Sequence, residues 1–178
     1  MAGQRLTDKT ALEQQTGSGD LFMVVDVNDT TGSAAGTSKK IDSKYIIQTD
    51  KFSLSNTDVQ DLDTTPKTLV GALSGYMVTP ISVTVLCTYA SPTETARKDL
   101  LFGFDESSDF FCWAKVDSAM DTLTFNGTYI IQGRGEPRTV SCDATILNKP
   151  FKVWAEGAGF NGGWSCDIYV TYAYTKIL

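Results

Sequence analysis

Two clusters of acidic residues come closest to a pattern that could do chemistry. They are Asp58, Asp61 and Asp63 in the segment DVQDLD, and Asp105, Glu106 and Asp109 in the segment DESSD. Neither cluster has the D-x-D-x-D-G spacing of a calcium loop, so we interpret both as solvated loop acids, with calcium in a surface loop as the alternative. Two carboxylates facing across a cleft could also hydrolyse a glycosidic bond, but nothing in the sequence singles out such a pair.

Histidine is absent from the chain, and its absence removes whole classes of catalyst. Without an imidazole there is no Ser-His-Asp or Cys-His relay and no zinc site that uses histidine. The cysteines lack C-x-x-C spacing, so we expect buried free thiols rather than zinc ligands at Cys87, Cys112, Cys142 and Cys166. The sequence therefore predicts no catalytic residue, no metal site and no cofactor.

The segment from Gly157 to Gly162, GAGFNG, matches the G-x-G-x-x-G pattern of dinucleotide-binding proteins. In those proteins the glycines open a helix whose backbone amides face the pyrophosphate. Here a strand-like segment, residues 164–174, follows the glycines instead of a helix. We therefore predict that the segment is a loop and not a phosphate site.

Aromatic residues could form a platform for a sugar, namely Trp113, Trp154, Phe160, Trp164 and Tyr169. Aromatic residues of β-sandwiches belong more often to the core than to a binding surface. Trp164 is the best candidate for exposure because it follows the glycine-rich loop. The residues expected to face a ligand, if there is one, are Phe160, Asn161 and Trp164.

Apolar residues beyond about residue 51 recur with the period of two that is typical of half-buried strands. The clearest case is the set of odd positions Ile81, Val83, Val85, Cys87 and Tyr89. The same alternation predicts strands over residues 140–146 and 166–174, and shorter strands are predicted over 100–104, 110–115, 123–131 and 151–156. Asn126-Gly127 is a type I′ turn signal, so a tight hairpin is the alternative for 123–131. The pattern predicts an all-β fold, an antiparallel β-sandwich with a jelly roll as the leading topology.

The N-terminal part differs from the rest. Residues 1–20 are polar and without periodicity, which indicates an extended arm. Residues 21–27 are predicted to form a strand, residues 39–41 the return strand of a short hairpin, and Asp42-Ser43 the cap of helical turns reaching Gln48. We therefore expect an N-terminal attachment segment, residues 1–50, and a sandwich domain, residues 51–178. A lone hairpin is not stable in water, so the residues expected to bind a partner are Leu21, Phe22, Met23, Val24 and Val25.

The net charge and the distribution of basic residues limit the classes of partner that the chain is expected to bind. Lys and Arg number 15 against 21 Asp and Glu, which gives a formal net charge of −6. Nucleic acid is not an expected partner, because the longest basic runs are pairs such as Lys39-Lys40. No segment approaches the ~20 apolar residues that span a bilayer, so membrane insertion is not expected. The N-terminus has no apolar run of the kind found in secretory signals, and we expect synthesis in a cytoplasm.

Two segments resemble proteins of tailed bacteriophages. Residues 19–41, GDLFMVVDVNDTTGSAAGTSKKI, are similar to a segment near the start of many virion proteins, in which a D-L-hydrophobic-V-x-D strand, a Thr/Ser/Ala/Gly loop and a T-x-K-K-I return precede a variable distal domain. Residues 64–90 are similar to the start of jelly-roll domains in phage fibre and head-decoration proteins, with the pattern T-L-V-x-A-x-x-G-Y-x-V-x-P-I-S-V. The chain lacks a repetitive shaft, which favours a short appendage or a head fibre over a long tail fibre.

The resemblance implies a non-enzymatic structural protein of the virion, made in the cytoplasm of the bacterial host. It would be a fibre or decoration protein bound to other virion proteins of the capsid, neck or tail, and a homotrimer. A host-surface glycan is a further candidate partner. A carbohydrate-binding module is the alternative function, and a glycan hydrolase is a more distant third.

Overall fold

The computed structural model describes residues 21–32, 34, 36–42, 46–104, 112–121, 127–133 and 146–176. The chain divides into two compact units, Met1–Ile46 and Ile47–Leu178. The boundary expected between residues 50 and 51 would cut through the first strand of the second unit, β3 (Gln48–Leu54). The arm predicted for residues 1–20 lies outside the described residues.

The first unit contains a two-stranded antiparallel hairpin, β1 (Leu21–Asp26) and β2 (Thr37–Asp42). Both strands were expected from the sequence, and both are confirmed. The helical turns expected up to Gln48 are not formed where the chain is described: Ile46 and Ile47 are irregular and Gln48 begins β3. Residues 43–45 lie outside the described part. Gln48 pairs with Tyr172 in a neighbouring strand, and one or two helical turns are too weak to compete with that pairing.

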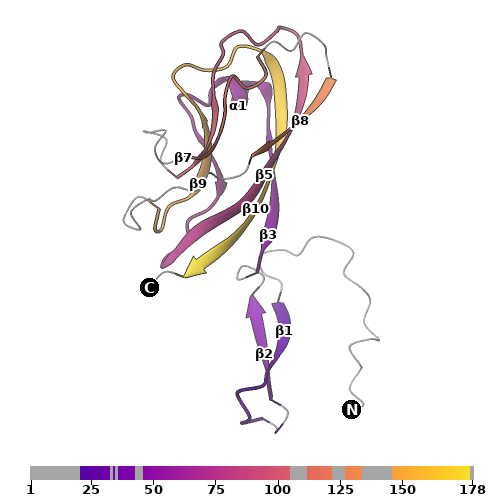
Figure 1. Ribbon diagram of the computed structural model, residues 1–178, viewed down its shortest axis with the longest axis vertical. Coiled ribbons are helices and arrows are strands. Elements are labelled where there is room, and N and C mark those ends of the chain that lie inside the picture. Colours follow the sequence, from indigo (N-terminus) through magenta and orange to yellow (C-terminus); the bar gives the residue numbers. More distant parts are fainter. Residues whose placement is uncertain are drawn as a thin grey trace. The chain divides into compact units, whose positions relative to one another are not determined.

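In its described residues, the second unit contains two four-stranded antiparallel sheets and one short helix (Figure 1). The first sheet has the order β3, β10 (Gly163–Lys176), β5 (Tyr76–Ala90) and β8 (Gly127–Gly133). The second sheet has the order β4 (Lys67–Val70), β9 (Phe151–Ala155), β6 (Leu100–Gly103) and β7 (Cys112–Val116). Core residues of both sheets form one continuous cluster, so the sheets pack face to face. The predicted all-β, antiparallel fold is confirmed.

The shorter strands agree with the sequence in most places. Those expected over 100–104, 110–115 and 151–156 correspond to β6, β7 and β9. The strand expected over 123–131 corresponds to β8, which begins at Gly127, and Asn126 of the alternative turn lies outside the described residues. Of the strand expected over 140–146 only Ile146 is described, and it lies in a turn.

The alternation in β5 holds for most of its length and then changes phase. Val83, Val85, Cys87 and Tyr89 are all buried, as predicted. Ile81 was expected in the same buried row but is 45% exposed. The cause is a β-bulge: the register with β10 shifts so that Thr171 pairs with Ser82 and Tyr172 pairs with Pro80. The extra residue turns the strand over, and the buried residue before the bulge is Val78, at an even position.

The helix, α1 (Asn56–Gln60), was not predicted. Ser55 caps its N-terminus: the Ser55 side chain accepts a hydrogen bond from the backbone N–H of Asp58, and the Asp58 carboxylate accepts from that of Ser55. Val59 is the buried residue of this helix and joins the core between the sheets. The S-x-x-D spacing is that of a capping box and could have indicated the helix.

Candidate interaction hairpin and the glycine-rich loop

The loop of the β1–β2 hairpin is held by short polar contacts. The Asp29 carboxylate accepts hydrogen bonds from the backbone N–H and the hydroxyl of Thr31, at 3.0 and 2.6 Å, and pairs with the Lys39 ammonium. These contacts, Lys39 first, lower the pKa of Asp29 to about 2. Gly36 has φ +111°, and a Cβ there would lie 2.7 Å from the carbonyl oxygen of Asp26, so the turn requires glycine.

The hairpin exposes nearly all of its apolar side chains. Met23 is 68% exposed and Val25 57%, and Phe22 and Val24 are exposed as well. The side chain of Leu21 lies outside the described part. Among the described strands β1 pairs with β2 alone, so its second edge carries unpaired backbone groups. The structure therefore places four of the five residues expected to bind a partner on an open surface.

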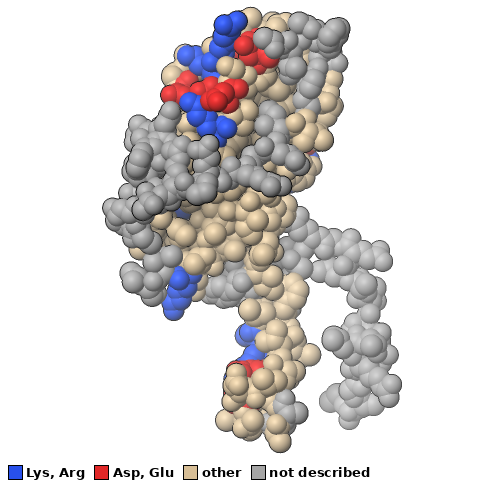
Figure 2. Space-filling model, in the orientation of Figure 1, with Lys and Arg blue, Asp and Glu red and all other residues tan. Residues whose placement is uncertain are grey.

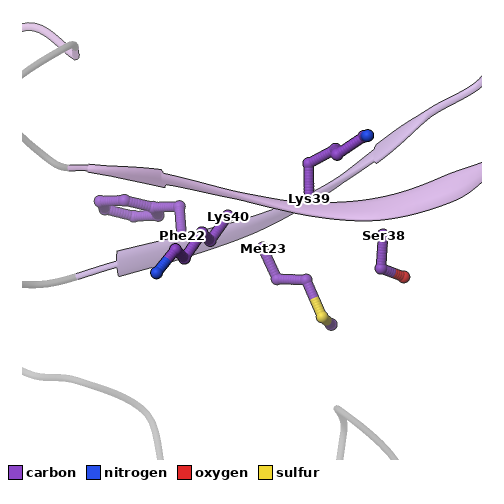
Figure 3. Close-up of a pocket in the computed structure, with 5 residues that line it drawn as sticks. All are labelled: Phe22, Met23, Ser38, Lys39 and Lys40. Carbon is purple, nitrogen blue, oxygen red and sulfur yellow. The ribbon is translucent and has the colours of Figure 1, made fainter. Parts of the chain in front are cut away.

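The two strands of the hairpin have opposite chemistry. Cross-strand partners share a face of the ribbon, and Val24 pairs with Lys39 while Met23 pairs with Lys40 and Val25 with Ser38. Figure 3 shows Lys39 on the side of the ribbon opposite Met23 and Ser38. β1 is thus apolar on both faces, whereas β2 is polar on both faces except at Ile41. The sequence indicated the apolar run but not this contrast, because the contrast depends on the register.

Phe160 and Trp164, which were expected to face a ligand, are buried. Phe160 is 4% exposed and Trp164 1% exposed, and the two rings pack edge to face with their centroids 4.9 Å apart. Trp164 lies in β10 in the same phase as Cys166 and Ile168, so its side chain points into the core. The expectation of an exposed aromatic platform at this loop was wrong.

Asn161, the third residue expected to face a ligand, is exposed but is used within the protein. Its side-chain oxygen accepts a hydrogen bond from the backbone N–H of Thr95, and its amide donates to the Thr95 hydroxyl, both at 3.0 Å. The side chain therefore ties the glycine-rich loop to the segment that follows β5.

Glu94 is a fully buried carboxylate that the sequence did not indicate. It accepts hydrogen bonds from the backbone N–H groups of Ala96, Asn161 and Gly162, and from the indole N–H of Trp164. The donor distances are 2.8–3.1 Å for the shortest bond to each donor. Every oxygen of this carboxylate is thus satisfied inside the protein, and the arrangement fastens two loops together rather than presenting an acid to a substrate.

The glycines of the G-x-G-x-x-G match serve close packing. A Cβ at Gly159 would lie 2.1 Å from the carbonyl oxygen of Gln60 at the end of α1, a contact that no side chain tolerates. The element that follows is the strand β10, as expected, so no helix N-terminus faces the loop. The loop is built to fit against α1 and Glu94, and not around a phosphate.

The acidic residues of the cluster at 58–63 stabilise the helix α1 and its surroundings. Asp58 closes the capping box and pairs with the Lys67 ammonium at 2.6 Å, and these contacts, Lys67 first, lower its pKa to about 2. Asp61 is the C-cap residue of the same helix. Within the described residues no group of acids, cysteines or histidines is arranged to hold a metal ion. Asp105, Glu106 and Asp109 lie outside the described residues.

Several charged side chains elsewhere on the sandwich form ion pairs. On the face of the molecule drawn in Figure 2, the described acidic and basic residues are intermingled and form no basic stripe. The Lys115 ammonium, for example, lies 2.7 Å from the Asp99 carboxylate and 3.1 Å from that of Glu156.

The described cysteines are buried free thiols, as expected. They are Cys87, Cys112 and Cys166, and Cys142 lies outside the described residues. Cys87 and Cys166 are cross-strand partners in β5 and β10. Burial raises the pKa of Cys87 to about 12 and also raises the pKa of Cys166. Both thiols therefore stay protonated and unreactive at neutral pH.

No family model matches the chain, and no curated protein matches it. In the part of the chain that the structure describes, no helix is long and apolar enough to cross a membrane.

Proposed function

We propose that this chain is a non-enzymatic structural protein of a bacteriophage virion, a fibre or decoration protein that is mounted through its N-terminal segment and displays the β-sandwich. The observation that carries the proposal is the contrast between the two units. The sandwich buries its own core, whereas the hairpin leaves Phe22, Met23, Val24 and Val25 exposed. Exposed apolar residues on a small two-stranded ribbon are typical of a segment that is completed by a partner. The resemblance of residues 19–41 to the start of phage virion proteins supports the same assignment.

The sandwich is proposed to be a jelly roll, and the order of its strands supports this. If the eight strands β3 to β10 are lettered B to I in chain order, the two sheets have the orders B-I-D-G and C-H-E-F. Each sheet then interleaves strands from the first and second halves of the domain, as two Greek keys do. Phage fibre and decoration proteins that resemble residues 64–90 carry the same kind of domain.

The proposed partners are other virion proteins of the capsid, neck or tail, and the homotrimer implied by the resemblance belongs to the same proposal. The carbohydrate-binding alternative depended on an exposed aromatic platform, and Phe160 and Trp164 are buried. No observation in the described residues now favours that alternative over the structural role.

The test is incorporation into particles. Phages that carry the double variant Phe22→Asp, Val24→Asp should assemble particles without this protein, as measured by immunoblot of purified virions and by electron microscopy. The matched control is Ile130→Asp, because Ile130 is an apolar residue of the sandwich that is 67% exposed. The control should be incorporated normally. If the double variant is incorporated at normal copy number, the hairpin is not the mount.

A further inference from the structure

Asn161 and Gly162 form an Asn-Gly dipeptide, a sequence in which asparagine is prone to spontaneous deamidation. The backbone nitrogen of the glycine loses its proton and attacks the side-chain carbonyl carbon of the asparagine, a five-membered succinimide ring closes, and ammonia leaves. Water then opens the ring to give aspartate or isoaspartate. Glycine in the second position favours ring closure because it has no side chain and the freest backbone. The reaction therefore needs a glycine nitrogen that is accessible and an asparagine side chain that can turn towards it.

Both groups are held in this structure. The backbone N–H of Gly162, a buried residue, donates to the Glu94 carboxylate at 2.8 Å. Removal of that proton would place a second negative charge beside the carboxylate and away from water, which is unfavourable. The Asn161 side chain is fixed at both ends, because its oxygen accepts from the backbone N–H of Thr95 and its amide donates to the Thr95 hydroxyl. The side chain is exposed to water, but the nitrogen that must attack it is not.

The main chain around Gly162 has no space for an additional atom. A Cβ at Gly162 would lie 2.9 Å from the Glu94 Cβ, and a Cβ at Gly163 would lie 2.3 Å from the carbonyl oxygen of Ser91. Isoaspartate routes the main chain through the former side chain and so lengthens it by one carbon at residue 161. A loop that is packed this closely cannot take up that carbon without breaking contacts.

We propose that Asn161–Gly162 is a site of self-modification that the folded protein suppresses. Glu94 and Thr95 keep the asparagine intact while the glycine-rich loop is closed, and deamidation follows when the loop opens locally. The isoaspartate product prevents the loop from closing again, so a chain that reacts while open keeps a permanent covalent mark. Water is the co-reactant and ammonia the leaving group. The inference does not depend on the proposed function as a virion protein.

The test is the rate at which residue 161 changes from an amide to an acid in the purified full chain, measured by peptide mapping with mass spectrometry. The chain is incubated at mildly alkaline pH, in buffer and in urea that unfolds it. The wild-type rate in buffer should be lower than that in urea by about tenfold or more, because opening the loop breaks hydrogen bonds to a charged group. Equal rates overturn the proposal, and this comparison needs no variant.

Variants identify the groups that protect the site. Glu94→Gln should raise the rate in buffer severalfold, and Thr95→Ala, at an exposed position, should raise it less. The matched control is Val85→Ala, which weakens the core without touching the loop and should leave the rate near that of the wild type. In urea all four chains should react equally fast. If Glu94→Gln reacts no faster than Val85→Ala, deamidation follows unfolding of the whole domain and the role of Glu94 is overturned. If circular dichroism shows that Glu94→Gln does not fold, Thr95→Ala decides in its place, and a wild-type rate there overturns the proposal.

The isoaspartate product has its own test. Chains deamidated in urea and returned to buffer are separated into those with isoaspartate and those with aspartate at residue 161. Asn161→Asp is the matched control, because it changes the side chain and not the length of the main chain. The isoaspartate chains should melt at a lower temperature than Asn161→Asp. Equal melting temperatures would show that the loop accommodates the extra carbon, which overturns the permanent mark.

Discussion

β1 and β10 are both strands of the same chain, but only β10 has its apolar residues buried. In β10 the buried positions alternate strictly from Trp164 to Tyr172, and the strand has neighbours on both edges, β3 and β5. In β1 successive residues are apolar, and no other described part of the chain covers its second edge or either of its faces. The period of the apolar residues thus indicates how many faces of a strand are expected to be buried. Alternation predicts one buried face, and a continuous apolar run predicts two.

The largest effect should come from a charge on the buried face of the sandwich. Val83→Asp should lower the free energy of unfolding by about 4 kcal/mol or more, because it buries an unpaired carboxylate. Thr84→Asp, on the opposite face of β5, and Val24→Asp, in the hairpin, should change the unfolding midpoint of the sandwich little. Urea titration followed by tryptophan fluorescence measures all three. Equal losses for Val83→Asp and Thr84→Asp would contradict the register of β5.

Removal of the buried carboxylate at Glu94 should have the next largest effect. Glu94→Ala leaves three backbone N–H groups and the indole N–H of Trp164 without an acceptor, and we expect a loss of about 3 kcal/mol or more. Glu94→Gln keeps one acceptor oxygen and should lose less. Thermal unfolding of both variants tests the order, and a neutral Glu94→Ala would show that the two loops are held by other contacts.

The stability of truncated chains should show where the sandwich domain begins. A chain of residues 47–178 keeps all of β3, whereas a chain of residues 51–178 loses Gln48 and Asp50, which both accept hydrogen bonds from the Tyr172 hydroxyl at 2.9 and 2.8 Å. We expect both chains to unfold cooperatively, with the shorter one less stable by about 1–3 kcal/mol. Calorimetry measures the difference, and equal melting temperatures would place the boundary at residue 50.

The smallest effect is the pH dependence that Asp58 contributes. Its pKa is about 2 in the folded protein and 3.8 for an ordinary aspartate, so its ionised form stabilises the fold above pH 3.8 and this stabilisation is lost as the pH falls towards 2. Asp58→Asn should therefore show a shallower loss of stability over that range. Lys67→Met should also do so, because it removes the cation that lowers the pKa most. Wild-type slopes in both variants would contradict this assignment.

Much of the fold could be predicted from the period of two, because alternation records directly which face of a strand is buried. The bulge near Ile81 could not be predicted, because one extra residue in a strand produces no recognisable sequence pattern. It is defined only by the register with the partner strand. Trp164 could have been placed correctly: it shares the even phase of Cys166 and Ile168, and its proximity to a glycine-rich loop carried less information. Nothing in the sequence indicated that Glu94 is buried, because a buried acid is recognisable only from the loops that surround it. The hairpin strands were predicted, but the contrast between them required the register.

The position of β10 has a consequence for the order in which the protein can fold during synthesis. β10 is one of the two inner strands of the first sheet and the last described strand in the chain. Its neighbours β3 and β5 end at Leu54 and Ala90, whereas β10 begins only at Gly163. Until residues 163–176 have left the ribosome, β3 has no described partner strand and the core face of β5 is incompletely covered. The nascent domain must therefore remain unfinished, with apolar surface accessible to chaperones, and a stop codon before residue 163 would remove the strand that joins the two halves of the sheet.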